Sequence, residues 1–473
     1  MQLALAIGLV VFFAVMVGIS LWARKRIHTG EDFIVAGRSL NGLMSTATIM
    51  ATWYAAETIL VTADWVREEG IQVAVLEPIG IGFCLMLAGF LYARKLWNTK
   101  LLTVADVVKS RFGTTAEKLQ AFISINYIGW VAVQLIGLAG VFHVYFGMPI
   151  STGILLLAAV LTLYTLLGGM WSVALTDIVQ LSLLLVGIVV LSVRVVSGLG
   201  TGGPISGLEA LFDQVDAQLL VLVPTGSADE LKTWFGLIVL GLFANIATQD
   251  LVQRMFSARS GRTAARSCIA AGLLYIVFGS LPVILGLAGS LLVDESVAQG
   301  VIPALAEKLL SPTIAVIFAL TLTAAVTSSV DSGLLAPASV LARNVLAPLL
   351  GTRIDLVTLT RICVVLIAIG STSIALSGTQ ASELIQGTYA LSIPPLVLLT
   401  AALYQKETRP LPGILTLGTG ITLWLVQVTA SIMAGDPEAE IFSPGFPVYL
   451  LLLSIAIYVV TDWLVKRLEK PKA

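Results

Sequence analysis

Apolar residues follow one another along nearly the whole chain in stretches separated by short polar connections. A helix needs about 20 apolar residues to cross a bilayer, so each stretch of that length is a candidate span. The pattern predicts thirteen spans, over 2–22, 41–66, 71–93, 116–146, 150–168, 170–198, 231–252, 266–292, 312–342, 356–378, 381–403, 411–434 and 446–466. The first begins without a basic leader or a small-residue cleavage site, so we expect it to be retained.

Composition excludes several classes of protein. Of the 473 residues 57% are hydrophobic and 12% charged, which is typical of an all-α integral membrane protein and not of a soluble domain. The net charge of −1 gives no basic footprint for nucleic acid. The chain has no phosphate-binding glycine loop and no nucleophile triad, and Cys84, Cys268 and Cys363 suit neither a metal site nor a disulfide framework. Ion-driven transport is therefore favoured over an enzyme.

The basic residues predict the orientation. If the N-terminus lies outside, only Arg67, Arg194, Lys232 and Lys308 face outward, which leaves 23 of the 27 Lys and Arg in the cytoplasm. The longest outer connection, 199–230, holds five acids and no Lys or Arg. We therefore expect a cytoplasmic C-terminus, and the short loops favour a bacterial inner membrane.

The stretch 321–341, TLTAAVTSSVDSGLLAPASVL, places polar side chains inside an apolar span. A charged residue at membrane depth costs about 2.5–3.5 kcal/mol on insertion scales, so Asp331 marks a candidate functional site. Ser328 and Ser332 share a helix face, the Ala325 carbonyl lies on that side, and hard cations prefer oxygen ligands. The alternative is helix packing through small residues whose hydroxyls bond back to the preceding turn, which we favour for Ser339.

Two other spans are interrupted. The middle of 41–66 is polar and aromatic and holds Glu57, and 231–252 ends in the polar run ANIATQDLVQR. Interrupted spans in corresponding positions indicate the broken helices of transporters built from inverted repeats, whose unwound backbone frees carbonyls for ions. The alternative is intact helices that line the interior of the bundle. Arg254 lies just after the span 231–252. A functional role in the interior and a role as a cytoplasmic anchor explain this residue equally well.

Four motifs resemble the sodium/solute symporter family. They are DFIVAGRSL (32–40), GGMWSVALTDIVQ (168–180), Gln249-x-x-x-Gln253-Arg254, and the run AAVTSSVDSGLLAPASVLARNV that contains most of the 321–341 stretch. The resemblance covers about 30–390 and implies a peripheral first helix, a five-plus-five inverted-repeat core and two C-terminal helices. The implied units are 1–40, the first repeat 41–198, the outer loop 199–230, the second repeat 231–403, and 404–473.

The resemblance also implies two ion sites. The common sodium site would use the carbonyls of Ala51, Tyr54 and Ala325 and the hydroxyls of Ser328 and Ser329. A second cation or proton site would involve Asp177, Asp331 and Ser332. Relatives usually carry a small residue at the position of Asp331. Two close carboxylates rarely both stay ionised without a cation, so the chain binds one or two sodium ions, and proton coupling stays open.

Solute contacts implied by the resemblance are Glu57, Thr58, Glu77, Thr248, Gln249 and Gln386, with Trp53 and Tyr389 as gate aromatics. Thr248 stands where relatives often have Asn or Asp, which weakens a direct transfer of sugar specificity. Glu57 and Glu77 favour a hydroxylated or amine-bearing solute. We predict a sodium-coupled symporter of a small polar solute (sugar, amino acid or carboxylate). A proton-coupled transporter and a solute-sensing membrane protein are the alternatives, and a monomer is compatible with the sequence.

Overall fold

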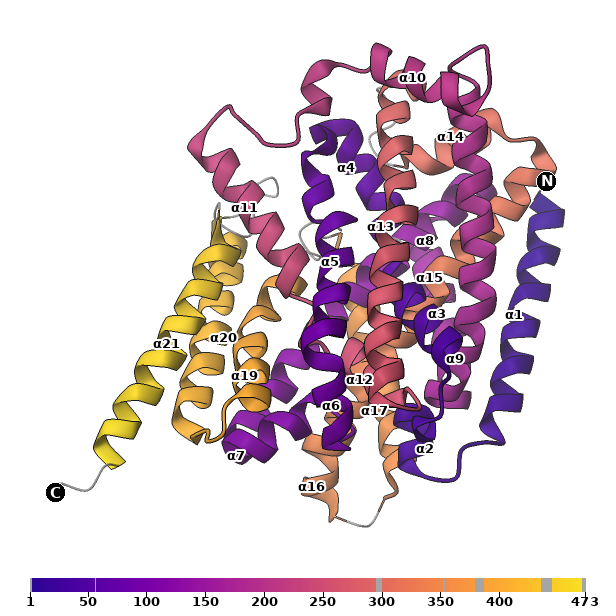
Figure 1. Cartoon of the computed structure of the whole chain (residues 1–473). Coiled ribbons are helices and arrows are strands. Elements are labelled where there is room, and N and C mark those ends of the chain that lie inside the picture. Colours follow the sequence, from indigo (N-terminus) through magenta and orange to yellow (C-terminus); the bar gives the residue numbers. More distant parts are fainter. Residues whose placement is uncertain are drawn as a thin grey trace.

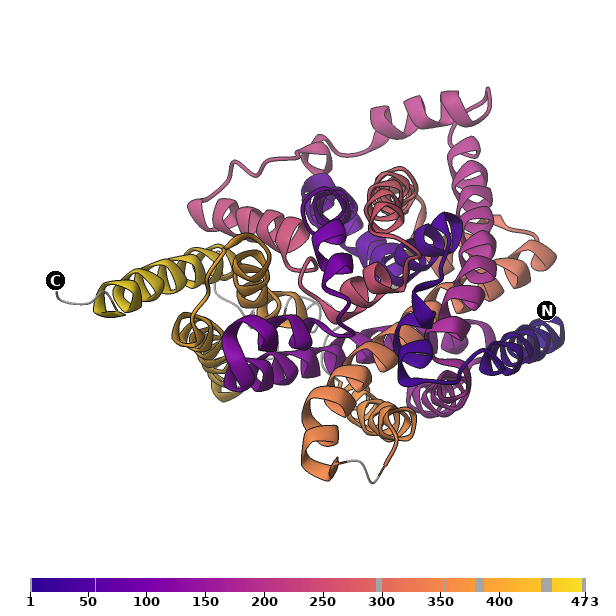
Figure 2. The same cartoon turned by 60° about the horizontal axis from the view of Figure 1, so that its bottom comes forward.

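A computed structural model of the chain describes residues 2–55, 57–294, 300–351, 354–378, 387–434 and 445–469 (Figures 1 and 2). The helices up to residue 197 are α1 (Gln2–Arg24), α2 (Gly30–Val35), η1 (Ala36–Arg38), α3 (Gly42–Trp53), η2 (Glu57–Val61), α4 (Thr62–Glu69), η3 (Gly70–Val75), α5 (Ile79–Leu87), η4 (Ala88–Tyr92), α6 (Ala93–Thr99), α7 (Val104–Ile123), η5 (Ser124–Asn126), α8 (Tyr127–Phe146) and α9 (Ile150–Ser197).

The second half continues with α10 (Pro204–Gln214), η6 (Ala217–Leu220), α11 (Ala228–Phe243), α12 (Gln249–Ser257), α13 (Gly261–Leu292), α14 (Val301–Leu309), α15 (Pro312–Val340), η7 (Leu341–Leu346), α16 (Ala347–Leu350), α17 (Leu356–Ala375), α19 (Ile393–Tyr404), α20 (Pro410–Ala434) and α21 (Phe446–Glu469). No strand occurs in the described ranges beyond one isolated bridge between Leu40 and Ala258. Both views place α1 and α21 on opposite sides of the bundle (Figures 1 and 2).

The predicted all-helical membrane fold is confirmed. Ten helical runs in the described ranges are long and apolar enough to span a membrane. Three of these runs are 43, 43 and 48 residues long, more than the roughly 20 that one crossing needs. The predicted number of thirteen crossings stays a prediction. The predicted span 116–146 has a different start, because α7 ends at Ile123 and α8 begins at Tyr127.

Both predicted helix breaks are present. Helix α3 ends at Trp53, the next residue has non-helical φ −80° and ψ 75°, and the chain resumes as the π-helical turn η2. Helix α11 ends at Phe243 and α12 begins at Gln249. Helix α9 also bends, at Gly169, where φ is +50° and an added Cβ would lie 2.5 Å from the Phe33 carbonyl oxygen. This bend joins the predicted spans 150–168 and 170–198.

Helix α15 runs through the centre of the bundle. Every residue from Thr321 to Val340 is buried, and the helix packs on α9, α8, α17, α1, α12 and α3. At Gly333 an added Cβ would lie 2.5 Å from Val131 Cγ2, so α8 and α15 approach closely there. The polar stretch predicted from the sequence is therefore enclosed on all sides.

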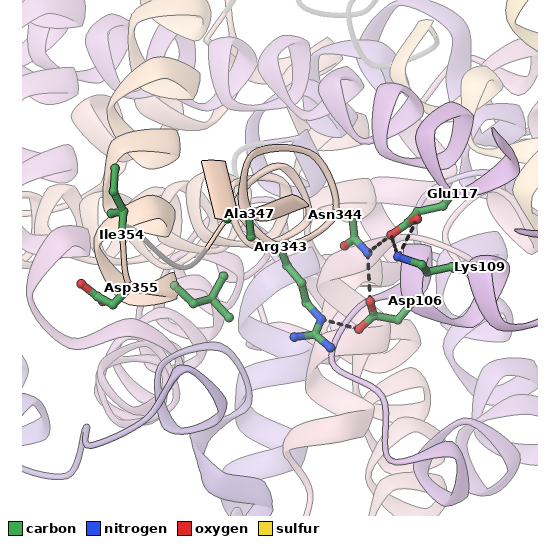
Figure 3. A pocket seen from close by; sticks show the side chains of 10 residues that line it. Asp106, Lys109, Glu117, Arg343, Asn344, Ala347, Ile354 and Asp355 are labelled. Carbon is green, nitrogen blue, oxygen red and sulfur yellow. Dashed lines mark hydrogen bonds and ion pairs between the residues drawn. The ribbon is translucent and has the colours of Figure 1, made fainter. Parts of the chain in front are cut away.

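A polar cluster ties the amphipathic helix α7 to the turn η7 that follows α15 (Figure 3). Asn344 Nδ2 donates to Asp106 Oδ1 at 2.9 Å and to Glu117 Oε1 at 2.8 Å. Arg343 Nε lies 2.6 Å from Asp106 Oδ2, and Lys109 Nζ lies 3.0 Å from Glu117 Oε2. A cavity of about 510 Å³ adjoins these residues. Asn344 bridges two acids and is itself 3% exposed.

We expect Asn344→Leu to lower stability by about 1–3 kcal/mol, because two carboxylates lose a buried donor. Arg343→Gln is the control, since that side chain is 35% exposed and exposed ion pairs contribute about 0–1 kcal/mol. Thermal unfolding in detergent compares the two variants. Equal losses would show that Asn344 contributes no more than the neighbouring ion pair.

Candidate functional site

The break after α3 places backbone carbonyls against α15. The Ala55 amide bonds to the Trp53 carbonyl at 2.9 Å instead of continuing the helix to Ala51. Ser328 Oγ therefore reaches the Ala51 carbonyl at 3.0 Å as well as the Ala325 carbonyl at 2.7 Å. The unwound turn thus leaves a carbonyl oxygen for a hydroxyl from another helix.

Ser329 completes this oxygen cluster. Its Oγ lies 3.3 Å from the Ala51 carbonyl, 3.0 Å from the Thr52 carbonyl and 3.4 Å from the Ala325 carbonyl. The cluster is buried and offers only neutral oxygens from two helices, a donor set that suits a hard monovalent cation. Hydroxyl groups that donate to these carbonyls can turn their lone pairs toward an ion.

Four of the five residues predicted for the sodium site come together here, namely Ala51, Ala325, Ser328 and Ser329. Within the described residues, the contacts that join them do not include the Tyr54 carbonyl. The Tyr54 phenol donates to the Phe278 carbonyl at 2.7 Å. The Thr52 carbonyl, which the sequence analysis did not include, takes part instead. Thr52 directly follows Ala51 in the chain, so its carbonyl lies at the same helix break. The predicted break was therefore the sequence signal that could have identified the Thr52 carbonyl.

The predicted second site lies beside the first, since Ser332 Oγ donates to the Ser328 carbonyl at 2.9 Å. Asp177 Oδ2 accepts from the Thr48 hydroxyl, and Asp331 Oδ1 accepts from the Tyr164 hydroxyl. The other oxygens, Asp177 Oδ1 and Asp331 Oδ2, are buried without a hydrogen-bond partner among the described residues. Each carboxylate therefore keeps one oxygen available for a cation.

Arg254 brings a fixed positive charge to this second site. Its Nη2 lies 4.0 Å from Asp177 Oδ2 and donates to Ser332 Oγ at 2.5 Å. Its Nε donates to the Thr48 carbonyl at 3.0 Å, and Nη1 to the Asp250 carbonyl at 3.1 Å. The side chain is 1% exposed, so the interpretation of Arg254 as a cytoplasmic anchor is wrong. Arg254 ends the polar run that interrupts the span 231–252. This interruption was the sequence signal that could have indicated a role for Arg254 in the protein interior.

A small cavity lies between the two broken helices. Its volume is about 10 Å³, and it is lined by Trp53, Asn126, Tyr127, Trp130, Asn245, Thr248, Asp250, Thr388, Tyr389 and Ser392. The predicted gate residues Trp53 and Tyr389 and the predicted solute residue Thr248 are among these. A cavity of this size holds about one water, so an organic solute requires the side chains to move apart.

Four rings and one acid dominate the wall of this cavity. Trp53, Tyr127, Trp130 and Tyr389 contribute the rings, and Tyr127 Oη donates to Asp250 Oδ1 at 2.5 Å. Tyr127, Trp130 and Asp250 were missed in the sequence analysis. The sequence does not show which face of an apolar span its aromatic residues occupy. Asp250, in contrast, lies in the polar run 244–254, and this position could have identified it as a candidate site residue.

Glu57 lies behind this wall. Trp130 Nε1 donates to Glu57 Oε1 at 2.8 Å, and the Gln134 amide donates to Oε2. Glu57 is 2% exposed and is not among the residues that line the cavity. The carboxylate therefore positions Trp130 in this structure.

Three other predicted solute residues, Thr58, Glu77 and Gln249, are not among the residues that line the cavity. Thr58 Oγ1 donates to the Trp53 carbonyl at 2.8 Å, and Glu77 Oε2 accepts from the Tyr275 hydroxyl. Gln249 Oε1 accepts from the Val104 amide at 2.8 Å, so this side chain meets the start of α7. Gln386 lies outside the described residues.

The sequence profile described as the Sodium:solute symporter family matches residues 33–405. The chain belongs to this family. It is 26% identical over 401 residues to the high-affinity choline transporter 1 of Drosophila melanogaster, covering 80% of this chain and 62% of that protein. It is 26% identical over 279 residues to the sodium/pantothenate symporter of Escherichia coli K12, covering 57% of each. The chain thus spans about three-fifths of the length of such relatives.

Solved structures support the fold of this multi-pass symporter family member. A Na+-coupled sialic acid symporter in a substrate-bound outward-open state matches with a TM-score of 0.78 and 18% identity, covering 98% of each chain. MHP1, a nucleobase-cation-symport-1 family transporter, matches with a TM-score of 0.57 and 15% identity, covering 92% of this chain and 95% of that one. The named relatives and neighbours are transporters, not enzymes.

Proposed function

We propose that the protein is a sodium-coupled symporter that moves a small solute by alternating access. The observation that carries this is the buried oxygen cluster where the α3 break meets Ser328 and Ser329. A sodium ion there would take the Ala51, Thr52 and Ala325 carbonyls together with the two hydroxyls. Because the ligands come from two helices, the ion favours whichever conformation holds α3 and α15 together.

Sodium and solute would be coupled through the chain itself. Ala51 and Thr52, whose carbonyls face the serines, are followed directly by Trp53, which lines the cavity. Fixing the unwound turn with an ion therefore fixes the position of the Trp53 ring. The coupling is reciprocal, so the solute must raise the affinity for sodium by the same factor.

We infer that Arg254 acts as a resident counter-ion at the second site. When both are ionised, Asp177 and Asp331 carry two negative charges, and one guanidinium lies next to Asp177 and Ser332. At most one mobile cation, a second sodium ion or a proton, then balances the remaining charge at Asp177, Asp331 and Ser332. Sodium titration at several pH values distinguishes these ions through the Hill coefficient and its pH dependence.

The solute is proposed to carry an ammonium group. Four aromatic rings and Asp250 surround the cavity, and no Lys or Arg occurs among its described lining residues. Ring faces attract ammonium groups, and quaternary ammonium ions are recognised by such aromatic cages. Choline, the solute named for several relatives, has this chemistry. A pantothenate carboxylate would instead meet the like charge of Asp250 in this wall.

Removing one ring should weaken ammonium binding. We expect Trp53→Ala to lower the affinity for choline by roughly 3- to 30-fold, because a desolvated cation–π contact contributes about 0.5–2 kcal/mol. Isothermal titration of purified protein in sodium, with choline, pantothenate and a neutral sugar as probes, measures this. Tyr389→Phe is the matched control, since its buried hydroxyl has no described partner and the ring is kept. Preferential binding of pantothenate would exclude the ammonium proposal.

Uptake tests the remaining alternatives. A symporter accumulates solute in proteoliposomes against its gradient when sodium is present outside, whereas a sensor binds without accumulation. Replacing sodium by potassium at fixed pH, or imposing a pH gradient alone, separates sodium from proton drive. We further propose an inner-membrane location with the N-terminus outside and the C-terminus in the cytoplasm, and repeats at 41–198 and 231–403.

A further inference from the structure

An apolar groove of about 500 Å³ lies between α5 with η4, the break after α11, α19 and α21. Its rim includes Leu91, Tyr404 and Ile455, which are 47%, 49% and 43% exposed. Its floor includes Ile246 and Tyr458, which are 1% and 3% exposed. The groove is therefore open to the bilayer and reaches the interior of the protein.

One end of the groove carries aromatic and cationic groups. Lys95 Nζ lies 4.1 Å from the centre of the Tyr404 ring, and Tyr404 Oη donates to the Leu91 carbonyl at 2.6 Å. The Arg111 guanidinium bonds to the carbonyl of Gln405, another lining residue. Tyrosine and lysine gather where a bilayer meets water, and Lys95 belongs to the predicted cytoplasmic side. Anionic phospholipids are concentrated on cytoplasmic leaflets.

We propose that the groove binds one acyl chain of an anionic phospholipid, with the head group at Lys95. Lipid tails already lie in an apolar medium, so burial of the chain gives little selectivity. Selectivity would come from charge at the Lys95 end and from packing against the apolar floor. The exposed Lys95 ammonium is held over the Tyr404 ring and is thereby placed at the mouth of the groove.

The bound chain would touch the back of the unwound segment between α11 and α12. Ile246 faces the groove, whereas its neighbours Asn245 and Thr248 line the small cavity between the broken helices. One five-residue segment therefore separates the lipid site from that cavity. A lipid chain packed against Ile246 supports the break from the membrane side.

Native mass spectrometry of the full-length protein tests this site. Delipidated protein is titrated with phosphatidylglycerol and, separately, with phosphatidylcholine. We expect Ile455→Trp, which fills the groove, to lower phosphatidylglycerol retention at least fivefold. Leu453→Trp is the matched control, because Leu453 is 41% exposed on the same helix but does not line the groove. Lys95→Gln should reduce the preference for phosphatidylglycerol over phosphatidylcholine roughly fivefold.

Equal retention by Ile455→Trp and Leu453→Trp would overturn the proposal. If Ile455→Trp does not fold, Val397→Phe replaces it in the test, because Val397 lies on α19 and a larger side chain there fills the groove from a different wall. A lipid-free dimer that Ile455→Trp disrupts would also overturn it, since the groove would then bind a second copy of the chain. None of these measurements depends on sodium or solute, so the lipid site and the transport proposal can fail separately.

Discussion

Replacing Arg254 by glutamine is expected to destabilise the protein by about 3–5 kcal/mol, among the largest effects of any single substitution in this chain. Removing one partner of a buried ion pair leaves the other charge without compensation. Here the guanidinium faces Asp177 and also donates to Ser332, the Thr48 carbonyl and the Asp250 carbonyl. Thermal unfolding of the purified variant in potassium measures the loss.

Sodium should rescue part of that loss. Without the guanidinium, Asp177 and Asp331 become an unbalanced pair of buried carboxylates, each with a free oxygen among the described contacts. A mobile cation that enters stabilises the folded state by mass action, so the unfolding temperature of Arg254→Gln should rise with sodium far more than that of the wild type. A sodium response no larger than that of the wild type would exclude a role for Arg254 as a counter-ion.

A double substitution separates charge from packing. In Arg254→Gln with Asp177→Asn, the unpaired charge at Asp177 is removed, so stability should recover relative to Arg254→Gln alone. If the single and double variants are equally unstable, Arg254 contributes through its hydrogen bonds and packing. Arg254→Lys keeps the charge but loses the forked donors, and its stability should fall between those of the wild type and Arg254→Gln.

Polar residues that interrupt apolar spans were the informative part of the sequence. Such residues are costly at membrane depth, so their presence at 52–58, 244–254 and 328–332 predicts the two breaks and a buried polar cluster on the central helix. That Ser328 and Ser329 meet the first break was implied only by the family resemblance. The side chain of Arg254 was not predictable in the same way, because a residue near a span end can point either outward or inward.

Two aromatic residues of the small cavity could not be predicted from the sequence. Tyr127 and Trp130 lie in a helix that is apolar on all faces, so no periodicity shows which side chains face the interior. Their positions depend on how α8 packs against α15 near Gly333, a contact between residues some 200 positions apart. Likewise Glu57 and Glu77 were expected at the solute, but in this structure Trp130 and Gln134 donate to the two oxygens of Glu57. The Tyr275 hydroxyl donates to Oε2 of Glu77.

Removing either serine hydroxyl at the α3 break should impair sodium activation. We expect Ser328→Ala or Ser329→Ala to raise the sodium concentration for half-maximal solute binding by roughly 10- to 100-fold, because an interaction with a charged group contributes about 1.5–3 kcal/mol. Sodium titrations of solute binding and of proteoliposome uptake measure the shift. Ser339→Ala on the same helix is the matched control, since Ser339 bonds only to the preceding turn, at Ala336, in the described structure.

The pattern of the loss distinguishes an ion site from simple helix packing. If the serines bind sodium, saturating sodium restores solute affinity in each variant, because Trp53 and the rest of the cavity wall are unchanged. If they only join α3 to α15, solute affinity stays low at every sodium concentration, and stability falls equally in sodium and in potassium. An unchanged sodium dependence in both variants would place the ion elsewhere. Since Ala51 and Thr52 directly precede Trp53, the first outcome would also show that the unwound turn links ion and solute.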